Sequence, residues 1–139
     1  MKSRGRYVFD TNVLVSALLF RASKPGNAFD FAFLRGSVLL SDTLLIELRD
    51  VLNRPKFDRY VSQAERLAFL ASLNANGEKV AVNVSIQACH DPKDNHILEL
   101  AVSGGATCIV TGDADLLALD PFQGIPIRTP DAFLAPPQP

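Results

Sequence analysis

Short apolar runs alternate with amphipathic stretches along almost the whole chain, and this alternation constrains the fold more than any other feature. The runs predicted to be strands are residues 6–10, 37–40, 79–84, 106–111 and 125–128. The stretches predicted to be helices are residues 13–20, 28–34, 42–53, 62–73, 94–103, 113–119 and 131–134. Strands that alternate with helices indicate a parallel sheet covered on both faces. The predicted fold class is therefore α/β, a three-layer α/β/α sandwich with a central parallel sheet of four to five strands.

Capping and breaking residues mark several of these boundaries. Ser41 or Asp42 is expected to cap the helix that follows the second strand. Ser62, with Glu65 three residues later, forms the pattern of a capping box. Residues 24–27 are predicted to be a loop. The last strand contains a proline, so we expect it at an edge of the sheet.

Length and composition fit one compact globular unit. The chain has 139 residues, of which 47% are hydrophobic and 21% charged, and this composition is too apolar for a disordered chain. We expect a single domain over residues 1–134 and a flexible tail over residues 135–139. The formal net charge of −1 excludes a global basic field, so a nucleic-acid partner would need a local basic patch.

The sequence pattern favours a cytoplasmic protein. Its two cysteines, Cys89 and Cys108, are too few for a disulfide framework and are predicted to be reduced, buried thiols. The first residues include basic side chains but no long apolar core and no cleavage site of the secretory type. No apolar run approaches the length that spans a membrane.

One predicted helix carries a carboxylate on its apolar face. The apolar residues that follow Asp94 at i+3, i+4, i+7 and i+8 are Ile97, Leu98, Ala101 and Val102. At about 100° per residue, Asp94 points into the middle of that stripe. A carboxylate on a core-facing stripe costs several kcal/mol unless its charge is compensated. No lysine or arginine follows one turn later, so we expect a bound cation to compensate Asp94.

Further carboxylates are expected to lie beside Asp94. Asp10 ends the first strand and Asp113 follows the fourth, and ligands of such sheets bind outside the carboxyl ends of the strands. Glu47 falls at the edge of the apolar face of helix 42–53. Acids gathered at one place repel one another and raise each other's pKa. Their oxygen atoms suit Mg²⁺ or Mn²⁺, whereas zinc prefers histidine or cysteine.

Each acid also has a simpler interpretation. Asp10, Asp91 and Asp113 are placed to cap the helices that follow them. Asp115 suits the positive end of a helix dipole, and Glu47 taken alone is better explained as a solvated residue. These roles do not explain why the acids gather at one edge of one sheet.

The histidines contribute no ligand pair to this prediction. His90 and His96 are the two histidines of the chain. Helix geometry points His96 away from Asp94, so we expect His96 at the surface.

The order and spacing of these residues resemble a known family. The matching features are Asp10-Thr11-Asn12, Glu47 within a helix, Asp94 followed by Ile97 and Ala101, and the run Thr111-Gly112-Asp113-Ala114-Asp115-Leu116. Together they resemble a PIN-domain nuclease, in particular a VapC-like toxin of a toxin–antitoxin system. The resemblance spans residues 7–134, and residues 91–117 are its most specific part.

This resemblance implies a PIN-like fold and a Mg²⁺- or Mn²⁺-dependent endoribonuclease. The residues it assigns to catalysis and metal binding are Asp10, Glu47, Asp94 and Asp113. Asp115 would add a metal contact through water, and Asn12 and Thr111 would orient a carboxylate or a metal-bound water. Asp91 is first of all a helix cap, and its second possible role is that of an outer ligand of the metal. The resemblance also implies a homodimer and a cognate antitoxin protein.

RNA binding would need local basic residues. The candidates are Arg21, Lys24, Arg54, Lys56 and Arg59, with Phe57 and Tyr60 placed between the last three for base stacking. A solvated loop with its aromatic residues turned inward is the simpler explanation for any one of them. A PIN-like module that binds RNA or protein without cleavage is the alternative function. Loss of one of the four acids would indicate that alternative, and all four are present.

Overall fold

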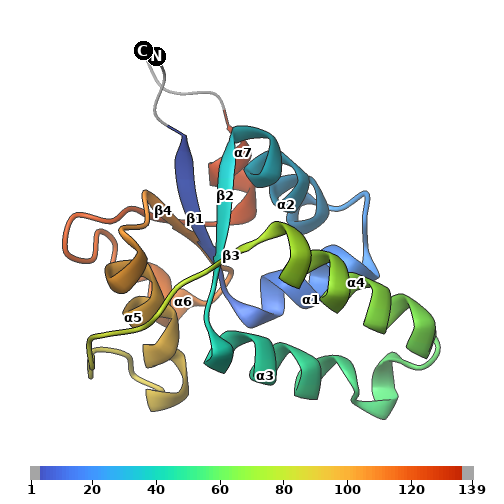
Figure 1. The fold of residues 1–139 in the computed structure, drawn as a ribbon. Helices are drawn as coiled ribbons and strands as arrows, with labels where there is room; N and C mark the ends of the chain where they lie inside the picture. The colour runs from blue at the N-terminus through green and yellow to red at the C-terminus, as the bar shows by residue number, and fades with distance from the viewer. Residues whose placement is uncertain (1–3, 136–139) are drawn as a thin grey trace.

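The computed structural model describes residues 4–135 and has a five-stranded sheet at the centre of the molecule (Figure 1). The strand order is β3-β2-β1-β4-β5, and every neighbouring pair is parallel. The strands are β1 (Gly5–Phe9), β2 (Gly36–Leu40), β3 (Glu78–Lys79), β4 (Cys108–Val110) and β5 (Ile127–Arg128). The predicted α/β class, the parallel sheet and the edge position of the last strand are confirmed.

Helices connect the strands and cover both faces of the sheet. The α-helices are α1 (Thr11–Leu19), α2 (Lys24–Arg35), α3 (Asp42–Leu52), α4 (Gln63–Asn76), α5 (Asn95–Gly104), α6 (Ala114–Leu117) and α7 (Pro130–Leu134), and the 3₁₀ helices are η1 (Pro55–Phe57) and η2 (Pro92–Asp94). Helix α5 packs against β1 and β2 from one side, and α2 packs against the same strands from the other (Figure 1). Helix α3 contacts α1, α4 and α5. The sandwich of three layers is therefore the one predicted.

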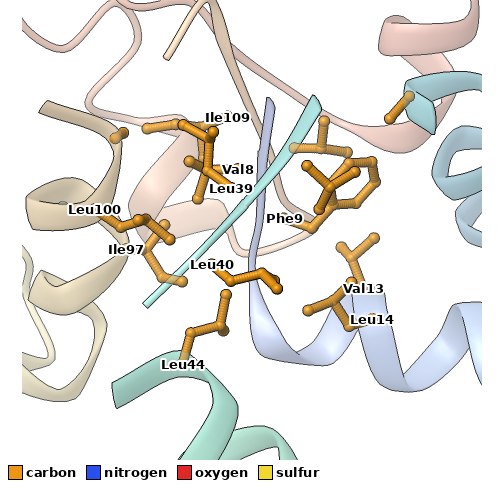
Figure 2. Close-up of a cluster of buried hydrophobic side chains, with 14 of the residues drawn as sticks. Val8, Phe9, Val13, Leu14, Leu39, Leu40, Leu44, Ile97, Leu100 and Ile109 are labelled. Carbon is orange, nitrogen blue, oxygen red and sulfur yellow. The ribbon is translucent and has the colours of Figure 1, made fainter. Parts of the chain in front are cut away.

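The hydrophobic core lies on both sides of the sheet because successive strand residues face opposite ways. Val8 lies on the side of Ile97 and Leu100 from α5, whereas Phe9 lies on the side of Val13 from α1 (Figure 2). All five side chains are buried. Packing on both faces of the sheet holds β1 in place and so fixes the position of Asp10, the residue that follows it.

Strands β1 and β4 end side by side. Phe9 pairs with Val110, and the backbone N–H of Asp10 donates to the carbonyl of Val110 at 3.1 Å. Asp10 and Thr111, the residues just beyond the two strands, therefore lie next to each other at the carboxyl edge of the sheet.

Local capping predictions are largely confirmed because they depend on neighbouring residues alone. Ser41 caps α3, and its hydroxyl accepts a hydrogen bond from the N–H of Leu44 at 3.1 Å. Ser62 and Glu65 form both hydrogen bonds of the capping box at the start of α4. Gly105 ends α5 in the left-handed conformation, with φ of 62°, which favours glycine.

The predicted loop at residues 24–27 is wrong, since these residues form the first turn of α2. Ser23 caps that helix and accepts a hydrogen bond from the N–H of Gly26 at 3.3 Å. Pro25 lies in the first turn, where the missing N–H of proline is not needed. The proline and glycine that suggested a loop are thus compatible with a helix start.

The predicted strand at residues 79–84 is too long. Strand β3 is confined to Glu78–Lys79 because its partner β2 ends at Leu40, where the chain turns into α3. Beyond that point the backbone has no neighbouring strand, and the N–H of Asn83 instead donates to the hydroxyl of Ser103 at 3.0 Å.

Other expectations concern the thiols and the chain ends. Both cysteines are free, Cys108 is buried and Cys89 is half-buried, and burial raises the pKa of each thiol to about 11.

The tail expected at residues 135–139 lies outside the described residues apart from Ala135. Among the residues that the structure describes, no helix has the length and apolarity to cross a membrane.

Candidate active site

Asp10 and Thr111 form the floor of the candidate site. Asp10 is only 7% exposed, and one of its carboxylate oxygens accepts a hydrogen bond from the N–H of Val13 at 2.8 Å. The fully buried hydroxyl of Thr111 donates to the other oxygen. Asp10 therefore caps α1, as one interpretation of the sequence held, and is also fixed from β4.

Asp113 follows on the same edge. Its N–H donates to the hydroxyl of Thr111 at 3.0 Å, and its carboxylate accepts from the N–H of Asp115 at 3.0 Å. Asp113 thus caps the short helix α6, while Thr111 links it to Asp10. The side chain of Asp115 is exposed.

Asp94 lies where η2 meets α5. It occupies the N-cap position of α5 but makes no side-chain capping hydrogen bond, and it is half-buried. Burial, a hydrogen bond with the side chain of Asp113 and the negative charge of Asp113 raise the pKa of Asp94 to about 6. The side chains of Asp94 and Asp113 therefore lie close enough to act on each other.

Glu47 reaches the site from α3. The hydroxyl of Thr11 donates to its Oε1 at 2.5 Å, and Nε2 of His96 lies 2.8 Å from its Oε2. The Glu47 side chain is 36% exposed, so it is held in place without being buried. Glu47 is thus partly solvated, as its position taken alone suggested, and is also held by two polar side chains.

The surface position predicted for His96 is wrong. Its side chain is 12% exposed. The prediction considered α5 alone, in which His96 points away from Asp94, but α3 packs against α5 and provides Glu47 as a partner on that side. The sequence carried no signal of this packing, so His96 and the hydroxyl of Thr11 were missed as site residues.

The negative charges of the site act on one another. Burial raises the pKa of Asp10, hydrogen bonds from Thr111 and Val13 oppose that shift, and the charges of Asp113 and Glu47 raise the pKa further. In the described part of the chain, no lysine or arginine forms a salt bridge with Asp10, Asp94 or Asp113. The four predicted acids, Asp10, Glu47, Asp94 and Asp113, thus form an acid cluster, and His96 is their only basic partner within residues 4–135.

The chemistry of this cluster fits a hard divalent cation, because its donors are carboxylate oxygens. The arrangement of these side chains does not by itself form a metal site. Within residues 4–135, no group of three or more His, Cys, Asp or Glu side chains is arranged to hold a metal ion.

A cavity of about 560 Å³ opens beside the acid cluster. Asp10 and Asp113 line it together with Asn12 and Ser16 from α1. The residues that complete its wall are Val13, Lys24, Pro25, Gly112, Thr129, Pro130 and Asp131. Lys24 is the only basic residue in that lining, and its Nζ lies 3.2 Å from a carboxylate oxygen of Asp131 on α7.

The other predicted site residues lie outside this cavity. Asp91 caps η2 by accepting a hydrogen bond from the N–H of Lys93 at 3.0 Å, as predicted, and its charge contributes to the raised pKa of Asp94. Arg21 pairs with Asp30 at 2.6 Å.

The basic and aromatic residues around η1 also lie outside the cavity. Arg54, Lys56 and Arg59 are exposed, and Lys56 lies over the ring of Phe57. Phe57 packs against the core, while Tyr60 is 54% exposed and contacts Phe20. Of the predicted RNA-binding residues, only Lys24 therefore lines the cavity beside the acid cluster.

Comparison with known proteins gives consistent matches. The model of the PIN domain family matches residues 6–115. An uncharacterized protein from Methanocaldococcus jannaschii is 31% identical over 120 residues, which cover 85% of this chain and 77% of that protein. A chain of the crystal structure of VapBC2 from Rickettsia felis bound to a DNA fragment from their promoter has a TM-score of 0.60 at 14% identity, covering 89% of this chain and 98% of that chain. At that identity the structural match concerns the fold.

Proposed function

This chain belongs to the PIN-domain family, and on that basis we propose that it is a metal-dependent endoribonuclease that acts as the toxin of a toxin–antitoxin pair. The proposal treats residues 1–134 as one functional unit. Its cofactor would be Mg²⁺ or Mn²⁺ and its substrate RNA.

One observation carries the proposal: carboxylates gather at the carboxyl edge of the sheet without lysine or arginine partners among the described residues. Asp10 is buried, the charges of Asp113 and Asp10 raise the pKa of Asp94, and the charge of Glu47 raises the pKa of Asp10. Such repulsion lowers the stability of the fold. A cation that binds the acids together is the simplest physical reason for keeping them there.

The acid cluster would hold the cation, and neighbouring hydroxyls would orient the acids. Thr111 fixes Asp10 from β4, and Thr11 fixes Glu47 from the first turn of α1. A bound divalent cation lowers the pKa of water and neutralises charge on a phosphodiester.

The cavity beside the acids would receive the RNA backbone. Asn12 and Ser16 offer polar side chains along its wall, and Lys24 offers the positive charge that a phosphate requires. The pair between Lys24 and Asp131 is weak because both side chains are more than 60% exposed, at 64% and 76%. A phosphate can therefore replace Asp131 as the partner of Lys24.

The proposed partners are a cognate antitoxin and a second copy of the chain. The structural neighbour from Rickettsia felis belongs to the VapBC2 complex, which supports a toxin of this kind. Co-expression with any small protein found to be encoded next to this chain, followed by light scattering of the complex and of the chain alone, tests both partners.

RNA cleavage in the presence and absence of a chelator tests the central proposal. Purified protein is incubated with total RNA in Mg²⁺ or Mn²⁺, with EDTA in a parallel sample. We expect defined fragments only when the cation is free. RNA that is bound but stays intact under all conditions would instead indicate a binding module.

A further inference from the structure

His96 makes the contact in this site that the acids alone do not explain. Its Nε2 lies 2.8 Å from Oε2 of Glu47, and its side chain is 12% exposed. His96 comes from α5 and Glu47 from α3, so the contact joins two helices that are distant in the sequence.

The contact completes a two-sided hold on the Glu47 carboxylate. Oε1 accepts a hydrogen bond from Thr11, and Oε2 faces His96. A glutamate on the face of a helix normally samples several rotamers, and fixing them in advance lowers the entropy lost on binding a ligand. Each carboxylate oxygen keeps a second lone pair, so a held Glu47 is still able to bind a cation.

The two ring nitrogens of His96 have different surroundings. Nδ1 is buried and has no hydrogen-bond partner in the described residues. An N–H at that position would be left without an acceptor, so the proton belongs on Nε2, which donates it to Glu47. Because Nδ1 is shielded from solvent, it has no route for taking a proton from substrate or for binding a metal.

We infer that His96 is a positioning residue of the proposed nuclease: its Nε2–H holds the Glu47 carboxylate in the orientation that receives the cation. This inference rests on the proposed function. It assigns no proton transfer to His96, and it explains why a half-buried histidine lies between α3 and α5.

A matched pair of substitutions separates the hydrogen bond from the volume of the side chain. His96→Gln keeps an N–H donor on a chain of similar length, whereas His96→Met fills similar space without a donor. Both are good helix formers, so both variants should fold, which circular dichroism checks. His90→Met makes the same change at an exposed histidine and is the control.

Mn²⁺ affinity of the RNA-free protein is the main readout, measured by isothermal titration calorimetry. We expect His96→Met to weaken Mn²⁺ binding by about 10–100-fold, as loss of a group that orients a metal ligand commonly does. His96→Gln should retain most of the affinity, and His90→Met should retain all of it. In cleavage assays at saturating Mn²⁺, the effect of His96→Met should fall on kcat rather than on KM for RNA.

A double-mutant cycle with Glu47→Gln provides the second test. If His96 acts through Glu47, His96→Met should have little further effect on Mn²⁺ affinity in the Glu47→Gln background. Two outcomes would overturn the inference even if the wild type cleaves RNA. One is an equal loss of Mn²⁺ affinity on His96→Met with and without Glu47→Gln, and the other is an equal Mn²⁺ affinity of His96→Gln and His96→Met. A wild-type protein that neither binds Mn²⁺ nor cleaves RNA would overturn the proposed function itself.

Discussion

Two carboxylate sites on this sheet are built in opposite ways. Glu78, the first residue of β3, accepts hydrogen bonds from both terminal nitrogens of Arg6, at 2.9 and 2.7 Å, and these bonds lower the pKa of Glu78. Asp10 and Asp94, at the carboxyl edge, have no such partner in the described chain, and burial raises the pKa of both. The fold is thus able to pair an acid with arginine, and it does so where no ligand is expected.

The difference distinguishes an acid that stabilises the fold from acids that, on the proposed function, bind a cation. The charged form of Glu78 stabilises the protein at neutral pH, whereas the charged form of Asp94 destabilises it unless a cation is bound. Substitutions that remove the charge should therefore have opposite effects at the two places.

The largest expected effect is the loss of cleavage on removing an acid of the cluster. Asp94→Asn and Asp113→Asn should each reduce metal-dependent RNA cleavage to background, because a holder of the cation is lost. Each should also raise the thermal midpoint of the metal-free protein, since the repulsion between the two acids is relieved. Calorimetry in EDTA and a gel assay of RNA measure the two effects. Undiminished cleavage by either folded variant would refute the assignment of the acid cluster.

A second expected effect is a dependence of stability on pH that a cation reverses. The pKa of Asp94 is raised from 3.8 to about 6. The stability that Asp94 adds to the folded protein is therefore fully present below pH 3.8 and is lost as the pH rises through about 6. In EDTA, the free energy of unfolding of the wild type relative to Asp94→Asn should therefore fall between pH 4 and pH 7. Mn²⁺ should restore stability at pH 7.5 far more than at pH 5. Urea titrations of both proteins measure this difference, and parallel pH curves would contradict it.

The contrast between the two sites also shows which features the sequence could predict. Asp10, Asp94 and Asp113 were placed together because strand ends and helix spacing are local patterns with a known direction in space. Strand 79–84 was too long because its length depends on where β2 ends. The pairing of His96 with Glu47 depends on how α3 packs against α5, and no pattern within either helix reports that packing.

A third effect, of several-fold size, concerns the rim of the cavity. Lys24→Gln should raise KM for RNA and reduce the salt dependence of binding, because a phosphate contact is lost. Asp131→Asn should act in the opposite direction, since it frees Lys24 from its weak pair. Arg21→Gln is the control, because Arg21 pairs with Asp30 and does not line the cavity. Equal effects of the Lys24 and Arg21 substitutions would remove Lys24 from the substrate site.

The smallest expected effect completes the comparison at the paired acid. Glu78→Gln should lower the free energy of unfolding by about 0.5–1 kcal/mol at pH 7, since the pair with Arg6 is partly exposed, and should leave RNA cleavage unchanged. Arg6 remains anchored by its Nε, which donates to the carbonyl of Gly104 at 2.8 Å, so the loss is one ion pair and not the whole contact. Asp30→Asn, at the more exposed pair with Arg21, should cost less stability. A rise in stability on Glu78→Gln would mean that Glu78 is strained like the acids of the cluster, and the distinction between the two sites would then fail.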